Sequence, residues 1–93
     1  MRPPSLLRLP DSRLCLTYGV RALPYGIRTR LSADLGKTWS DSIVLRDDGG
    51  SADVGYVRSV VRSDGCVVAV YYYTDQSSSA RYLAATIWDP RAP

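Results

Sequence analysis

An internal repeat limits the folds that this chain can adopt. Residues 7–18 align with residues 60–71 at an offset of 53 residues, and residues 25–31 align with residues 81–87 after a slip of about three residues. The first alignment contains, in each copy, an apolar run, a turn centred on Asp and a second apolar run that reaches a Tyr. We therefore expect two copies of one supersecondary unit, the second of which ends after its third strand.

The apolar residues occur in short runs that turn residues separate, and no window has sustained helical spacing. Alternation along residues 66–73 puts apolar side chains on both faces of that segment, as expected for a strand between neighbouring sheets. For the run Tyr71-Tyr72-Tyr73 this favours packing over a ligand platform. The sequence predicts an all-β protein with strands at residues 5–9, 14–20, 26–32, 43–46, 56–62, 66–73 and 82–88.

The composition excludes several kinds of chemistry. The 93 residues contain no His and no Glu, so all nine acidic residues are Asp. An imidazole base, a His metal ligand or a glutamate would have to come from another chain, and we expect no metal and no cofactor. The net charge of +3 is spread without a basic run, which argues against nucleic-acid binding.

The cellular location is predicted from whether the chain contains a membrane span or a secretory signal segment. No run approaches the ~18 apolar residues of a membrane span. Nothing resembles a secretory segment, because the N-terminus turns within a few residues into a short strand. A cytoplasmic protein is expected, in which Cys15 and Cys66 are buried free thiols rather than a disulfide.

Residues 32–39 form an eight-residue motif that matches the Asp-box pattern Ser-x-Asp-x-Gly-x-Thr-Trp. In a tight turn Asp34 can accept hydrogen bonds from amides, Gly36 can take angles that a side chain forbids, and Trp39 can pack over the sheet. With this motif the chain resembles the sialidase-like (BNR repeat) β-propellers. In that family such boxes lie on outer turns, so the resemblance implies a structural role for Ser32, Asp34, Gly36, Thr38 and Trp39.

The resemblance implies a fold of four-stranded antiparallel blades, because repeats of about 40 to 50 residues are typical of propellers. Residues 1–93 would be a single region, with a first blade at 5–46 and an incomplete second blade at 56–89. Two blades alone would expose apolar faces to water, so a homo-oligomer is expected. Three chains would close the six-bladed ring of a sialidase-like propeller. A domain-swapped dimer and a barrel of rearranged strands are the alternatives.

Residues 53–60 resemble the late sialidase blade in which a Gly-Tyr strand start bears the nucleophilic tyrosine, and Tyr56 matches that position. In the family a carboxylate activates this phenol, and a covalent glycosyl-tyrosine forms. Arg21 matches the third of the three arginines that hold the substrate carboxylate. The activating Glu, the acid-catalyst Asp and the other two arginines have no counterpart, and the acid that follows the Tyr strand is replaced by Tyr72. A single chain is therefore not expected to be an enzyme.

Arg28 and Arg30 alternate with apolar or small residues of one predicted strand. This spacing puts both guanidinium groups on one side, where they are either a solvated face or a bidentate site for a carboxylate or sugar hydroxyls.

Three functions from different classes agree with these residues. The first is a carbohydrate- or acid-sugar-binding module with Arg21, Arg58 and Tyr56 at a central mouth. The second is a sialidase-type glycoside hydrolase active only as an oligomer, in which Asp53 or Asp75 replaces the missing carboxylate. The third is a structural or assembly protein without a ligand of its own.

Overall fold

The computed structural model describes residues 4–91, and within them the backbone forms seven strands. The all-β prediction is confirmed. Among these residues there is no helix with the length and apolarity that crossing a membrane requires. The strands are β1 (Ser5–Arg8), β2 (Leu14–Val20), β3 (Gly26–Ser32), β4 (Ile43–Arg46), β5 (Gly55–Val61), β6 (Val67–Asp75) and β7 (Ser78–Trp88).

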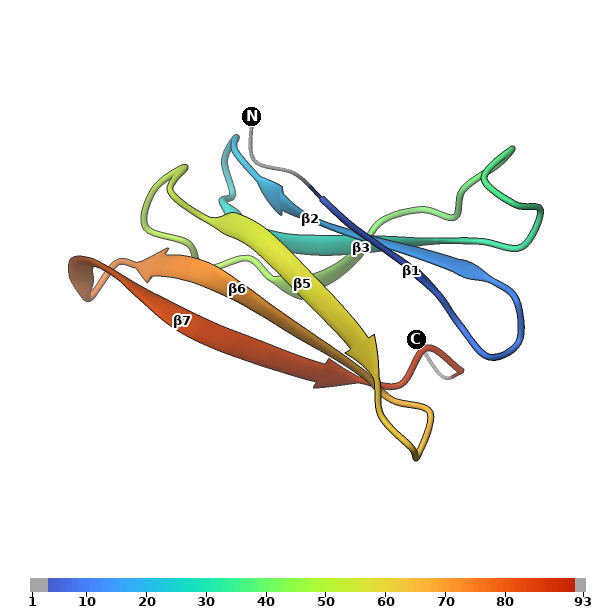
Figure 1. The fold of residues 1–93 in the computed structure, drawn as a ribbon. Coiled ribbons are helices and arrows are strands. Elements are labelled where there is room, and N and C mark those ends of the chain that lie inside the picture. The colour runs from blue at the N-terminus through green and yellow to red at the C-terminus, as the bar shows by residue number, and fades with distance from the viewer. Residues whose placement is uncertain (1–3, 92–93) are drawn as a thin grey trace.

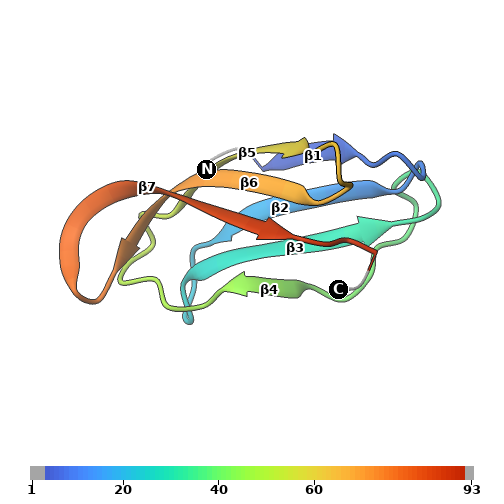
Figure 2. The ribbon, with the colours of Figure 1, turned by 90° about the horizontal axis from the view of Figure 1, so that it is seen from below.

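The strands form two antiparallel sheets in chain order. The first sheet has the order β1-β2-β3-β4, and the second has the order β5-β6-β7. The sheets are stacked on each other, with β5 in contact with β1 and β2 (Figure 1). Figure 2 shows β5 near β1 at one edge of the stack and β4 at the opposite edge.

The two sheets have the same internal pairing register. Each pair of residues that face each other across β2 and β3 corresponds to a pair across β6 and β7, at offsets of 53 and 56 residues. The corresponding pairs include Leu14↔Ser32 with Val67↔Trp88, Thr17↔Thr29 with Val70↔Ala85, and Val20↔Gly26 with Tyr73↔Tyr82. The sequence repeat is therefore also a repeat of strand pairing.

The slip in the repeat lies in the connection between β6 and β7. Three extra residues there extend the hairpin, so Asp75 pairs with Ser78 across a two-residue turn. The Asp75 carboxylate accepts a hydrogen bond from the backbone N of Ser77 at 2.9 Å, which closes that turn. The strand predicted at residues 82–88 is thus too short, because β7 begins at Ser78, four residues earlier than expected.

The β1–β2 and β5–β6 turns also repeat each other. The Leu9 amide donates to Arg13 O at 2.8 Å, and 53 positions later the Arg62 amide donates to Cys66 O at 2.8 Å. In both turns a central Asp accepts a hydrogen bond from the amide two residues later, at 3.1 Å in the first and 3.0 Å in the second. Local turn chemistry therefore fixes the same hairpin twice.

The core lies between the sheets. Along β6, Val67, Ala69, Tyr71 and Tyr73 are buried against the first sheet, whereas Val70 and Tyr72 are exposed on the other face. One buried cluster joins Ile27 of β3 to Val54, Val57, Ala69, Tyr71 and Tyr73. A second joins Leu9, Cys15 and Leu31 to Val67.

Two buried threonines lie within this core, beside buried Cys15. The Thr17 and Thr29 hydroxyls are 3.1 Å apart, and Cys15 Sγ lies 3.3 Å from Thr29 Oγ1. Thr29 also donates to the backbone carbonyl of Leu16 at 3.0 Å. Both cysteines are free thiols, but Cys66 is only half-buried, because it lies between an exposed turn and the start of β6.

Candidate functional site

The Asp-box forms the turn that follows β3. The Asp34 carboxylate accepts hydrogen bonds from Thr38 N at 2.8 Å, Thr38 Oγ1 at 2.5 Å and Ser32 Oγ at 2.9 Å. These bonds, those from Thr38 foremost, lower the pKa of Asp34 to about 2. Gly36 takes a φ of 90° and donates its amide to Ser32 Oγ at 2.8 Å, and Trp39 is half-buried. The Asp34 carboxylate is therefore engaged in holding the turn together.

Tyr56 lies at the other end of the stack, where the chain enters β5 (Figure 1). Its φ of 52° is in the left-handed region, which is a strained conformation for a bulky residue. A bulge between Gly55 and Arg58 interrupts the pairing with β6 at this point. Tyr56 is 48% exposed, and its ring meets the Tyr72 ring edge-to-face, with centroids 5.9 Å apart.

The end of β2 contacts the segment that precedes Tyr56. A Cβ on Gly19 would lie 2.8 Å from Val54 O and 3.0 Å from Gly55 Cα, so only a glycine permits this approach. Arg21 follows two residues later and is exposed. The close contact therefore brings Arg21 and Tyr56 to the same end of the stack, although they are far apart in the sequence.

Two adjoining hollows lie at this end. The first, of about 590 Å³, is bordered by Pro4, Ser5 and Leu6 and by residues 56–60, which include Tyr56 and Arg58. The second, of about 370 Å³, is bordered by Arg21, Arg30 and Pro4 together with Leu16, Tyr18, Gly19 and Val54. Pro4 borders both. Within residues 4–91 neither Arg21 nor Arg58 forms an ion pair.

Arg28 and Arg30 share the face of β3 that points away from the second sheet. Arg28 donates to Ser42 Oγ at 3.3 Å. Arg30 donates to Tyr18 OH at 3.3 Å and to Ser40 O at 3.2 Å, and the bond to Tyr18 raises the pKa of Arg30. Both guanidinium groups therefore hold parts of their own sheet, and of the two only Arg30 borders a hollow.

Arg81 and Tyr72 lie next to one another beside Tyr56. Arg81 was not selected as a site residue from the sequence. Arg81 Nε lies 3.4 Å from Asp53 Oδ2, and its guanidinium carbon lies 5.4 Å from the centroid of the Tyr72 ring. No sequence motif marks Arg81, since its partners come from two other segments of the chain. Asp75 is instead used in its hairpin, where it also accepts a hydrogen bond from Tyr82 OH at 2.8 Å. Of the two aspartates considered from sequence, Asp53 is the one linked to Tyr56.

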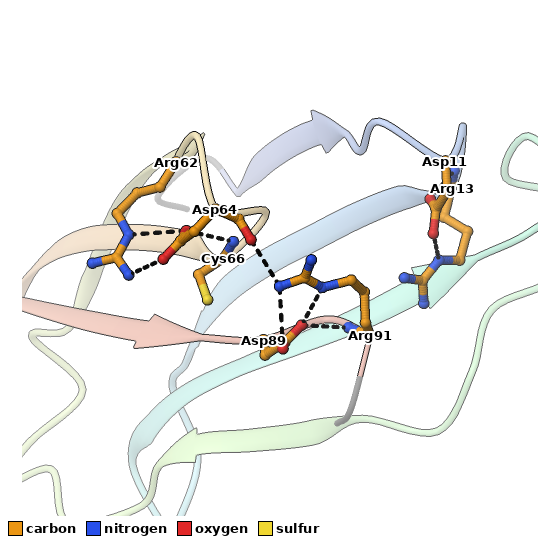
Figure 3. Close-up of polar contacts among 7 residues, drawn as sticks. All are labelled: Asp11, Arg13, Arg62, Asp64, Cys66, Asp89 and Arg91. Atoms are coloured by element: carbon orange, nitrogen blue, oxygen red, sulfur yellow. Dashed lines mark hydrogen bonds and ion pairs between the residues drawn. The ribbon is translucent and has the colours of Figure 1, made fainter.

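A further hollow of about 270 Å³ lies between the β1–β2 turn, the β5–β6 turn and Pro90–Arg91. Figure 3 shows that its charged side chains are paired with one another: Arg13 with Asp11 at 2.7 Å and Arg91 with Asp89 at 2.8 Å. Arg91 also donates to Asp64 O at 2.8 Å. These pairs satisfy the charges locally, which distinguishes this hollow from the one that contains Arg58. Among the described residues, no cluster of three or more metal-ligating side chains occurs.

No protein-family model matches this chain, and no curated protein matches it. Its structure is similar to the crystal structure of a protein of unknown function from Dyadobacter fermentans DSM 18053, with a TM-score of 0.82 and 36% sequence identity. The match covers 95% of this chain and 24% of that chain, so this chain spans about a quarter of that protein's length. The fold and the site define the class as an all-β repeat protein of two stacked antiparallel sheets.

Proposed function

We propose that this chain is a pair of sialidase-like propeller blades that binds an acidic sugar beside Tyr56 without hydrolysing it. The observation that carries the proposal is the position of Arg58 and Tyr56 in one hollow, next to a second hollow that contains Arg21. The site lies at the edge where β1 and β5 meet.

The chemistry of these side chains suits an anionic sugar. A guanidinium group binds a carboxylate through two parallel hydrogen bonds, and a tyrosine offers both an apolar ring face and a hydroxyl. Arg21 and Arg58 have no ion-pair partner within residues 4–91, so both charges are available to a ligand. The volumes of about 590 and 370 Å³ are in the range of small-molecule sites.

Binding is favoured over hydrolysis because the carboxylates are engaged elsewhere. Retaining glycosidases of the usual kind need two carboxyl groups, and sialidases need one to activate the tyrosine. Asp53 is held by Arg81, Asp75 closes its hairpin, and Asp34 closes the Asp-box turn. The sequence supplies no Glu or His that could replace them.

The blade arrangement is supported by the repeat of strand pairing and by the stacking of the two sheets. Each sheet is an antiparallel meander in chain order, as a propeller blade is. The first sheet has four strands and carries the Asp-box in the turn before its last strand. Three such chains would supply the six blades of a sialidase-like ring.

Titration with the methyl glycoside of N-acetylneuraminic acid, followed by protein NMR, tests the sugar site. We expect shifts at Tyr56 and Arg58, and a loss of affinity of about tenfold or more in Arg58→Ala, because charge-assisted hydrogen bonds contribute about 1.5–3 kcal/mol. Arg8→Ala is the matched control, since Arg8 is an exposed arginine of β1 that borders neither hollow. The methyl ester of the same sugar removes the carboxylate charge and is expected to bind much more weakly.

The same samples separate binding from turnover. We expect no release of the fluorophore from a fluorogenic sialoside. Turnover that disappears in Tyr56→Phe would favour the oligomeric glycoside hydrolase instead. No binding at millimolar sugar, or equal binding by the wild type and Arg58→Ala, would refute the proposed site.

A further inference from the structure

The second sheet has an exposed apolar face. Val60, Val70, Leu83 and Ile87 all lie on the side of β5–β7 that points away from the first sheet, with exposures of 60%, 38%, 65% and 55%. Together with half-buried Val68 they form what we call the outer face of the second sheet. Arg58, opposite Val70, and Tyr72, opposite Leu83, lie on the same side. Contiguous apolar surface of this kind marks an interaction site in soluble proteins.

The repeat identifies what this face corresponds to. Its residues lie 53 or 56 positions after residues of the first sheet that are covered by the second sheet. Val60 corresponds to Leu7, Val68 to Cys15, Leu83 to Ile27 and Ile87 to Leu31, as the shared pairing register requires. Those four first-sheet residues belong to the two clusters between the sheets. The outer face of the second sheet thus has the same position in its repeat as the face of the first sheet that is covered by the second sheet.

The first sheet has an outer face that corresponds to the buried, inner face of the second sheet. Its side that points away from the second sheet contains Leu14, Leu16 and Tyr18, which correspond to Val67, Ala69 and Tyr71. The three second-sheet residues are buried against the first sheet. Leu6 and Val44 add exposed apolar area to this side, at 62% and 48% exposure. We call Leu6, Leu14, Leu16, Tyr18 and Val44 the outer face of the first sheet.

We propose that the outer face of the second sheet binds the outer face of the first sheet of a second copy of this chain. The contact would repeat, between chains, the stacking that the two sheets of one chain make with each other. Arg28 and Arg30 also lie on this side of the first sheet, opposite Tyr18 and Leu16, and they can keep their hydrogen bonds to Tyr18, Ser40 and Ser42 of their own chain when they are covered. The proposal rests on the blade arrangement proposed above. It shares residues with the proposed sugar site, because Leu6 and Val60 border the first hollow and Leu16 and Tyr18 border the second, so assembly is measured in the absence of sugar.

This interface is head-to-tail, because each copy contributes a different face to it. Such an interface forms a closed ring when the rotation per copy divides the circle, and three copies would bring six sheets around one axis. A head-to-tail interface also predicts that damage to one face leaves the other face able to bind.

Light scattering after gel filtration tests the proposal with the full chain. We expect a mass of about three times the 10.3 kDa of one chain. Leu83→Asp damages the second-sheet face and Leu6→Asp damages the first-sheet face, so each variant alone is expected to be monomeric. A 1:1 mixture of the two is expected to form a heterodimer through the two undamaged faces. Leu23→Asp is the matched control, because Leu23 is an 81% exposed leucine in a loop and belongs to neither face.

Circular dichroism establishes that each variant is folded, and Ile87→Lys replaces Leu83→Asp should the latter unfold. A monomeric wild type at several hundred micromolar would overturn the proposal. So would an assembly that survives in either single variant, since this would require an interface between identical faces. Leu83 borders neither hollow, so the Leu83→Asp variant tests sugar binding with the hollows uncovered. A monomeric wild type that binds sugar would reject only the assembly, whereas a trimeric wild type whose Leu83→Asp variant binds no sugar would reject only the proposed ligand site.

Discussion

The buried pair of threonines between β2 and β3 gives a prediction whose size follows from the structure. Thr17 and Thr29 are fully buried and face each other in the pairing register, with hydroxyl oxygens 3.1 Å apart. The equivalent pair in the second sheet is Val70 with Ala85, so the repeat accepts apolar residues at this position. Valine has nearly the shape of threonine, and the substitution therefore isolates the hydroxyl group.

The two single substitutions are expected to lower the free energy of unfolding by different amounts, because they remove different hydrogen bonds. Thr29→Val removes the bond to Leu16 O and leaves the Thr17 hydroxyl with a contact of 3.8 Å to Cys15 Sγ, so we expect a loss of about 2–3 kcal/mol. Thr17→Val leaves the bond from Thr29 to Leu16 O in place, and we expect a loss of about 1 kcal/mol. In the double variant no hydroxyl is left without its partner. We expect it to lose about 1 kcal/mol less than the sum of the single losses.

Urea unfolding, followed by the fluorescence of the two tryptophans, measures these differences. A small domain loses about 1 kcal/mol per molar urea, so a coupling of this size shifts the midpoint by about 1 M. All variants are compared at one protein concentration, because assembly would add to the apparent stability. Thr17→Ser keeps the hydroxyl and loses only a methyl group, which makes it the control. Strictly additive losses would refute the reasoning, since they would mean that the two hydroxyls do not depend on each other.

Two further predictions concern acid and the close contact near Tyr56. Asp34, Asp48 and Asp64 each have a pKa of about 2, lowered from the ordinary 3.8 chiefly by hydrogen bonds from Thr38, Arg46 and Arg62. The stability that these carboxylates contribute is therefore complete above about pH 4 and is lost as the pH falls to about 2. The midpoint of urea unfolding should be constant down to pH 4 and then fall. A constant midpoint down to pH 2 would contradict this prediction. Gly19→Ala should destabilise the fold by about 1–3 kcal/mol, because the added Cβ would lie 2.8 Å from Val54 O. The same substitution should change the NMR signals of Tyr56. Unchanged Tyr56 signals would contradict the close contact between Gly19 and the segment before Tyr56.

The candidate site was predicted only in part. Tyr56 and Arg58 were selected from the sequence, and they border one hollow. Arg28 and Arg30 lie on one face, as alternate residues of a strand do, but they hold their own sheet. Arg81 could not be found from sequence, because Asp53 and Tyr72 come near it only when β5, β6 and β7 are paired.

The sequence by itself determined the repeat and, apart from the start of β7, the positions of the strands. These features depend on residues a few positions apart: an Asp that accepts a hydrogen bond from the amide two residues later, a glycine at a left-handed position, and an alternation along each strand. The offset of 53 residues was visible in the sequence because both copies use the same local chemistry.

Only the tertiary structure decided which face of each sheet is covered. Both faces of β6 are apolar, so alternation gives two faces but cannot say which of them meets the first sheet. Stacking buries Tyr71 and Tyr73 and leaves Tyr72 outside, beside Tyr56. The same stacking brings Gly19 against Gly55 and so assembles the edge that carries the proposed site. Contacts of this range depend on the whole arrangement of the sheets, and no short segment of the sequence encodes them.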